Sequence, residues 1–164
     1  MTVLCLNLMV GKLWLCEKQA RKMSHKRKMR VLFVCIGNAC RSPMGEAIAR
    51  KEANDVMEAS SAGFYPMGMI PEMTQTTLQR NGYSANGLRP KGLREIRSKE
   101  IDLVVNLSGY ARAQSLEKFV EVENWEVSDP YGADEATYQR ILEEIRGRVR
   151  DLAQRLRKGQ SAAV

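Results

Sequence analysis

The stretch that decides the fold reads VLFVCIGNACRSP and spans residues 31–43. Its first five residues form a continuous apolar run with β-branched members, which is typical of a strand buried in a parallel sheet. A loop of small residues follows, and Pro43 stands where the first position of a helix is expected. The segment therefore predicts a strand, a tight loop and a helix in direct succession.

The rest of the chain continues this alternation. Further strands are expected at 57–62, 101–107 and 119–122, and further helices at 74–80, 92–98, 111–118 and 134–158. Strands separated by helices predict an α/β fold, a single-domain open sheet of four parallel strands with helices on both faces. In such sheets the ligand binds beyond the carboxyl ends of the strands. There the loop after residue 35 is expected to meet segments 106–109 and 128–131.

Charge is distributed unevenly along the chain. Of the 26 basic and 19 acidic residues among 164, residues 1–30 hold eight basic and one acidic, which leaves 18 of each sign from residue 31 onward. The sequence is therefore interpreted as a basic, flexible extension over 1–29 and a neutral domain over 30–164. A neutral domain does not predict nucleic-acid binding. The apolar run at 3–16 is too short and too interrupted for a membrane span, and the sequence makes no prediction of oligomeric state.

Cysteine and histidine are scarce. The four cysteines lack the density of a secreted disulfide framework, which favours a reducing, cytoplasmic location; they are Cys5, Cys16, Cys35 and Cys40. The one histidine, His25, lies in the basic extension. No metal site and no cofactor are therefore expected.

The loop between the first strand and its helix has the composition of an anion site. Gly37 and Asn38 tolerate the backbone conformations that curl a loop until its N–H groups converge. The helix that follows adds its positive end to the same point. Such a cradle stabilises the thiolate form of a cysteine at its floor, here Cys35. Arg41 offers a planar fork for a tetrahedral oxyanion, and Ser42 offers a hydroxyl to the sulfur.

Residues 34–43 resemble the signature of the low-molecular-weight protein tyrosine phosphatases. The resemblance covers about 30–156 and includes Ser61-Ala62-Gly63, Asn81-Gly82 and Asp129-Pro130-Tyr131. It implies hydrolysis of phosphotyrosine proteins or small aryl phosphates without a metal, through a phosphocysteine. Cys35 would be the nucleophile, Arg41 the phosphate clamp, and Asp129 the general acid and then the base. The residues expected to bind substrate are Gly37, Asn38, Ala39, Cys40, Ser42 and Tyr131.

Some details stay open at this stage. Cys40 is either the partner of Cys35 in a reversible disulfide, as the resemblance implies, or a small buried side chain. Tyr131 is expected on the wall of an aryl pocket, while Phe64 and Tyr65 fit a wall or the core equally well. Many family members carry a histidine shortly after the Asn-Gly pair, and residues 84–89 contain none. The support of Asn38 must therefore differ here.

Two other functions compete with phosphatase activity. Arsenate would fit the same cradle, but thioredoxin-linked arsenate reductases need further cysteines, and none follows Arg41. A non-catalytic oxyanion or phosphotyrosine binder would be expected if Cys35, Arg41 or Asp129 were replaced, and all three are present. The sequence therefore favours a phosphatase, with arsenate reduction second.

Overall fold

The computed structural model describes residues 27–110 and 114–161. Its four strands form one parallel sheet in the order β2-β1-β3-β4; they are β1 (Met29–Cys35), β2 (Met57–Gly63), β3 (Leu103–Asn106) and β4 (Val122–Asn124). The α-helices are α2 (Arg41–Glu52), α3 (Glu72–Arg80) and α4 (Glu135–Ser161). Short 3-10 helices follow at η1 (Leu93–Glu95), η2 (Ser98–Glu100) and η3 (Gln114–Leu116). The expected α/β architecture with four parallel strands is confirmed.

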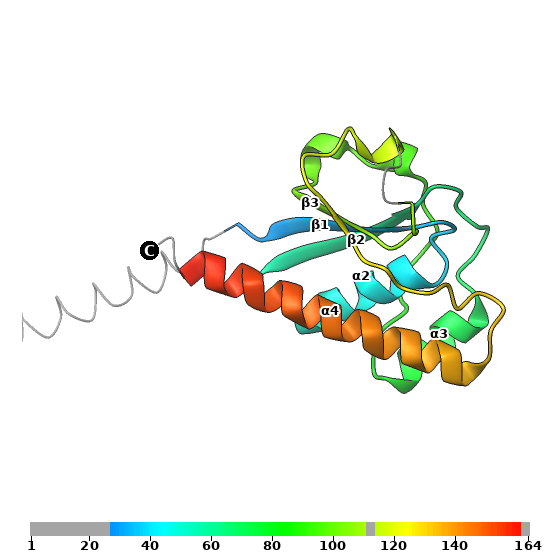
Figure 1. Cartoon of the computed structure of the whole chain (residues 1–164). Helices are drawn as coiled ribbons and strands as arrows, with labels where there is room; N and C mark the ends of the chain where they lie inside the picture. The colour runs from blue at the N-terminus through cyan, green and yellow to red at the C-terminus, as the bar shows by residue number, and fades with distance from the viewer. Residues whose placement is uncertain (1–26, 111–113, 162–164) are drawn as a thin grey trace, which may run out of the picture.

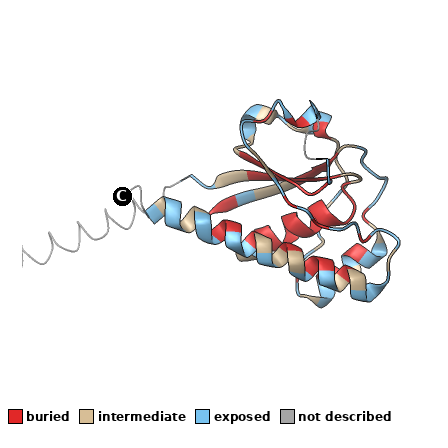
Figure 2. Ribbon diagram, in the orientation of Figure 1, coloured by how far each residue is buried: buried red, intermediate tan, exposed pale blue. Residues whose placement is uncertain are grey.

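The two faces of the sheet are covered by different kinds of helix. Alternate side chains of β1 point to opposite faces, because the side-chain period of a strand is two. Val31 and Phe33 join the core beneath α2 and α4, whereas Leu32 and Val34 join a smaller core with Leu93 of η1. Figure 1 shows the three α-helices together on one side of the sheet and the short helices on the other. Figure 2 shows the buried residues on β1 and on the inward faces of α2 and α4.

Three predicted elements differ from the structure. Of the helix expected at 111–118, the described residues 114–118 form only η3 and a turn. The expected helix at 92–98 is replaced by η1 and η2, because Gly92 forms a bridge to Gly63 at the end of β2 and Ile96 is extended. The expected strand at 119–122 begins only at Val122. Phe119 is instead buried against the sheet in the smaller core, at the turn that follows η3. The apolar residues of segments 92–98 and 119–122 are therefore explained by burial against the sheet, not by the expected helix and strand.

The helix after the loop begins two residues earlier than predicted. Arg41, not Pro43, is the first residue of α2, and Cys40 is its N-cap without a side-chain hydrogen bond. Pro43 still lies in the first turn, where its missing N–H is tolerated. The first turn contains no acidic residue, which leaves the positive end of the helix available to an anion.

The first strand begins one residue before the predicted start of the domain at residue 30. β1 starts at Met29, whose N–H donates to the carbonyl of Val56 at 2.9 Å. Most of the predicted basic extension, residues 1–26, lies outside the described residues, as do residues 111–113 of the helix expected at 111–118. Within the described residues, no helix is both long and apolar enough to cross a bilayer.

Asp102 fastens the start of β1 to the segment before β3. Its carboxylate accepts hydrogen bonds from the guanidinium groups of Arg27 at 3.0 Å and Arg30 at 3.3 Å, and from the Arg30 backbone N–H at 2.8 Å. Burial alone would raise the pKa of this carboxyl, but the hydrogen bonds from the two arginines outweigh it and hold the pKa well below its usual range.

Asp102→Asn is expected to lower the melting temperature at pH 7 and to flatten its dependence on pH. The folded-state pKa lies below the unfolded value of about 3.9, so the stabilisation is present above that value and is lost as the pH falls further. Thermal melts between pH 7 and 2.5 measure this. Asp151→Asn, which removes an exposed carboxyl on α4, is the matched control. An unchanged pH slope in Asp102→Asn would contradict the assignment.

Candidate active site

Cys35 ends β1 at the carboxyl edge of the sheet. Only 2% of its surface is exposed, and its Sγ lies 3.0 Å from the hydroxyl oxygen of Ser42 in the first turn of α2. Ser42 Oγ accepts a hydrogen bond from the Asn38 amide at 2.9 Å. That contact uses an acceptor lone pair, so the single hydroxyl hydrogen of Ser42 has two acceptors within reach, the sulfur at 3.0 Å and the Ala62 carbonyl at 3.3 Å.

Asn38 holds the loop from inside. It is fully buried and is the one non-glycine residue with positive φ among the described residues, at 48°. Its amide also donates to Ser61 Oγ at 2.9 Å, and its Oδ1 accepts from the Lys91 backbone N–H at 2.7 Å. The sequence led us to expect that Asn38 is supported without a histidine. In the structure, a serine in the last part of β2 and a backbone amide provide that support. An added Cβ on Gly63 would lie 2.7 Å from the Asn38 backbone nitrogen, so only glycine fits there.

A buried carboxylate extends this network. Glu46 of α2 is fully buried, accepts hydrogen bonds from the Ser61 hydroxyl and the Arg50 guanidinium, and lies 3.7 Å from the Lys91 ammonium. Two cations and a hydroxyl offset the cost of burying its charge. Sequence reasoning missed Glu46 and Lys91 as supports of the loop. The charge at a core-facing position of a short helix was the one available signal.

Asn38→Ala is expected to lower the free energy of unfolding by about 2–4 kcal/mol, because it leaves buried groups unpaired. Asn38→Gly loses the same hydrogen bonds but tolerates the positive φ, so it is expected to be more stable than Asn38→Ala by about 1 kcal/mol. Urea denaturation measures both. Asn86→Ala, at an exposed position, is the control. Equal stability of the two Asn38 variants would contradict backbone strain at this position.

Arg41 is held by backbone carbonyls of the two segments that follow β3 and β4. The guanidinium is buried, and its NH1 donates to the carbonyl of Leu107 at 2.7 Å and to that of Val127 at 3.2 Å. Its NH2 donates to Asp129 Oδ2 at 2.5 Å. Its Nε is buried and has no hydrogen-bond partner. A buried donor without a partner is costly, so Nε is a donor that the fold leaves unused among the described residues.

Asp129 brings a carboxylate to the same place from the far end of the chain. Its side chain is 43% exposed, and its Oδ1 accepts a hydrogen bond from the Tyr131 backbone N–H at 3.2 Å, which fixes the turn. A pocket of about 190 Å³ lies here, lined by Cys35, Ile36, Gly37, Ala39, Cys40, Tyr65, Met67, Asp129 and Tyr131. Of the predicted site residues, Asn38, Arg41 and Ser42 lie outside this lining and support it from behind.

The pocket walls settle the open question about the aromatic residues. Tyr65 lines the pocket and is 75% exposed, whereas Phe64 is half-buried against the smaller core. Tyr131 lines the pocket as expected. Met67 forms a further wall that sequence reasoning missed, and an added Cβ on Gly37 would lie 3.0 Å from its Cγ. The opening above Cys35 is therefore bordered by two aromatic rings and a thioether.

Cys40 differs from Cys35 in its surroundings. Its Sγ lies 3.4 Å from the Tyr138 hydroxyl, on the side of α4. Burial raises the pKa of the Cys40 thiol, although the contact with the Tyr138 hydroxyl lowers it in part. Cys40 is therefore held as a protonated thiol. Tyr138 is buried in the core, as its position in the apolar stripe of α4 predicts.

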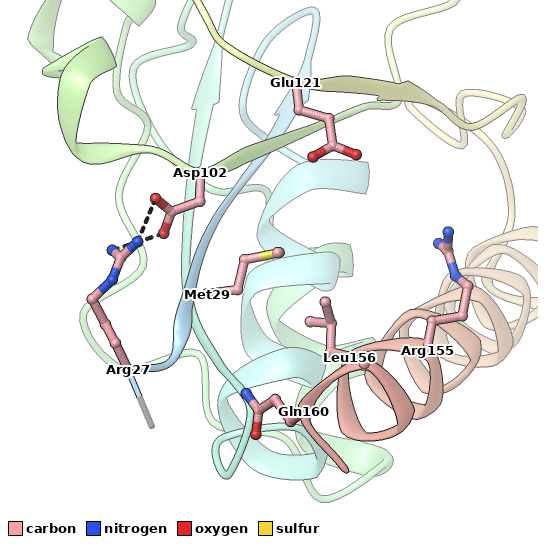
Figure 3. A pocket seen from close by; sticks show the side chains of 8 residues that line it. Arg27, Met29, Asp102, Glu121, Arg155, Leu156 and Gln160 are labelled. Atoms are coloured by element: carbon pink, nitrogen blue, oxygen red, sulfur yellow. Dashed lines mark hydrogen bonds and ion pairs between the residues drawn. The ribbon is translucent and has the colours of Figure 1, made fainter. Parts of the chain in front are cut away.

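A second hollow lies at the other end of β1. It has a volume of about 450 Å³ and is lined in part by Arg27, Met29, Asp102, Glu121 and Arg155. Figure 3 shows these side chains around the opening, with Arg27 turned to Asp102. Its lining, among the described residues, contains neither cysteine nor serine. Among residues 27–110 and 114–161, no group of three or more histidine, cysteine or acidic side chains is arranged to hold a metal ion.

Comparison with known proteins identifies relatives over most of the chain. The model of the low molecular weight phosphotyrosine protein phosphatase family matches residues 30–162. Arsenate reductase 1 of Bacillus cereus is 30% identical over 131 residues, which cover 79% of this chain and 97% of that protein. The solved arsenate reductase of Archaeoglobus fulgidus is 34% identical, with a TM-score of 0.69 over 76% of this chain and 98% of its own. The solved low molecular weight protein tyrosine phosphatase of T. tengcongensis is 33% identical, with a TM-score of 0.69 over 79% of this chain and 100% of its own.

Proposed function

The chain belongs to the low molecular weight phosphotyrosine protein phosphatase family, and we propose that it hydrolyses phosphomonoesters, phosphotyrosine proteins first among them, through a phosphocysteine on Cys35. One observation carries this proposal. The thiol of Cys35 and the carboxylate of Asp129 line one small pocket, and directly behind it lie a serine hydroxyl in contact with the sulfur and an arginine that is paired with the carboxylate and has an unpaired Nε. These are the parts that phosphoryl transfer to sulfur requires: a nucleophile, a clamp and an acid.

The first half of the reaction transfers the phosphoryl group to sulfur. The Cys35 thiolate attacks phosphorus and the bond from phosphorus to the aryl oxygen breaks. Protonated Asp129 gives its proton to that oxygen, so a neutral phenol leaves. The substrate phosphate takes the place of Asp129 on NH2 of Arg41, and Nε supplies the second arm of a bidentate contact. The ring of the leaving group lies between Tyr65 and Tyr131.

The second half restores the enzyme. The Asp129 carboxylate accepts a proton from a water molecule, whose oxygen attacks the phosphorus of the phosphocysteine. The phosphorus–sulfur bond breaks and the thiolate leaves, stabilised by the Ser42 hydroxyl. Inorganic phosphate is the product, and Asp129 is again protonated. The chain's own residues account for each step.

Arsenate reduction is the second candidate, and the relatives named arsenate reductases favour it. It takes two electrons from thiols, so either a second cysteine of the chain or an external thiol must take over the oxidation from Cys35. In the described part of the chain, the one other cysteine is Cys40, and its sulfur contacts Tyr138. We place phosphatase activity first because an acid at the pocket mouth serves a leaving group, and arsenate reduction releases no aryl oxygen.

The test measures both activities on the full chain. Phosphate release from phenyl phosphate is followed with a chelator and a reductant present, and oxidation of NADPH is followed with arsenate, thioredoxin and thioredoxin reductase. We expect phosphate release that the chelator does not affect. NADPH oxidation without phosphate release would establish the reductase instead. Absence of both from folded, reduced protein would leave a non-catalytic oxyanion binder. A cytoplasmic location belongs to the same proposal, because a reactive thiol needs a reducing compartment.

A further inference from the structure

A long groove lies beside the active-site pocket. It has a volume of about 760 Å³, and one wall is formed by the segment after β2 while η1 and the region of η3 form the other. Its lining residues include Phe64, Tyr65, Pro66, Leu93, Arg94 and Lys118. Tyr65 also lines the pocket above Cys35. The two hollows therefore share a wall, and a chain leaving the pocket over Tyr65 enters the groove.

The groove presents positive charge. Its one acidic side chain, Glu95, accepts hydrogen bonds from the Gly92 backbone N–H at 2.8 Å and from Arg89 at 3.2 Å. Those two contacts lower the pKa of Glu95, so its charge is present and already paired. Arg94 is exposed, and no ion pair joins it to a described residue. It is a cation that no described residue neutralises.

Lys118 supplies a second cation on the same wall as Arg94, next to η1. Its ammonium donates to the carbonyl of Leu93 at 3.1 Å and lies 5.2 Å from the centre of the Phe119 ring. These contacts position the ammonium beside η1 and leave two of its three N–H donors for a ligand. Phe64 and Pro66 on the facing wall and Leu93 beside the two cations offer apolar surface. The groove thus combines apolar walls with two positive groups that no described carboxylate neutralises.

We propose that this groove binds an acidic segment of the protein substrate next to the phosphotyrosine, with Arg94 and Lys118 as the recognition groups. The inference rests on the proposed function, which places the phosphotyrosine ring against Tyr65. Aspartate or glutamate side chains one to a few residues from the phosphotyrosine then reach the guanidinium of Arg94 and the ammonium of Lys118. Small aryl phosphates end at Tyr65 and do not use the groove.

The test compares peptide and small substrates in the full chain. The substrates are phenyl phosphate and three phosphotyrosine peptides that carry two glutamates before the phosphotyrosine, two glutamates after it, or alanines on both sides. One acidic peptide is expected to exceed the alanine peptide by about tenfold in kcat/KM, mainly through KM, since the contacts lie away from the reacting atoms. High salt is expected to reduce this preference.

The double variant Arg94→Ala/Lys118→Ala is expected to lose the preference while keeping turnover of phenyl phosphate and the alanine peptide. Arg97→Ala, which removes an exposed arginine paired with Glu100 at 3.2 Å outside the groove, is expected to keep it. Equal kcat/KM for all three peptides in the wild type, or an acid preference that survives the double variant, overturns the proposal.

Failure of the proposed function gives a different result. If phenyl phosphate is not hydrolysed, binding of fluorescent peptides to Cys35→Ser is measured by anisotropy. Tighter binding of an acidic peptide that the double variant abolishes supports the groove without any turnover. Equal affinity for acidic and alanine peptides overturns it.

Discussion

Cys35→Ser is expected to abolish phosphate release from phenyl phosphate, a loss on the order of 10⁴-fold or more, because no other group can take the phosphoryl group. A serine hydroxyl is not ionised at neutral pH and is a far weaker nucleophile than a cysteine. The variant keeps Arg41 with its unpaired Nε. It should therefore still bind inorganic phosphate, which calorimetry measures.

Cys40→Ser separates the two thiols. The Cys40 sulfur is directed to Tyr138 rather than to Ser42, so this variant should still turn over phenyl phosphate. Mass spectrometry of protein quenched during turnover should find phosphate on Cys35 in the wild type and in Cys40→Ser. Turnover at the wild-type rate in Cys35→Ser would contradict the covalent mechanism.

Asp129→Ala is expected to reduce kcat by about 10² to 10⁴, the range typical of a lost general acid. The loss should be largest for phenyl phosphate and smallest for 2,4-dinitrophenyl phosphate, whose phenolate leaves without a proton. A plot of log kcat against leaving-group pKa should therefore steepen in the variant. The change also frees NH2 of Arg41, which donates to Asp129 in the structure. Inorganic phosphate should consequently inhibit the variant more strongly than the wild type.

Asp134→Ala is the matched control for Asp129. Asp134 accepts a hydrogen bond from the Thr137 backbone N–H at 2.9 Å and caps the start of α4. Its loss should cost about 1 kcal/mol of stability and leave the leaving-group dependence unchanged. If both variants show the same dependence on the leaving group, Asp129 is not the acid.

Tyr65 lines both the active-site pocket and the groove proposed to bind the protein substrate. Phe64 and Tyr65 are adjacent aromatic residues, and composition does not distinguish them. The structure separates them because Phe64 turns to the smaller core while Tyr65 is left exposed between the pocket and the groove. A variant at Tyr65 would therefore disturb both hollows, whereas Arg94 and Lys118 report on the groove alone.

Elements whose signals are local could be predicted from the sequence. β1, the loop and α2 follow from an apolar run, small residues and a proline within 13 consecutive positions, residues 31–43. The long helix α4 follows from apolar residues at helical spacing. The structures of segments 92–98 and 119–122 could not be predicted from such signals, because their apolar residues Leu93 and Phe119 cover one face of the sheet without forming a regular helix or strand. Periodicity alone does not tell a covering turn from a helix or a strand.

By itself, the sequence determined the α/β class, the parallel strands, the strand-loop-helix unit at Cys35 and the residues expected to carry the chemistry. Only the tertiary structure decided how they meet. The ion pair of Arg41 and Asp129 joins residues 88 positions apart, and the hydrogen bond from Lys91 to Asn38 spans 53. Contacts of that separation depend on which strands are neighbours and on which side chains are buried together. Propensity and spacing describe only a few residues at a time, and so they contain no information on either.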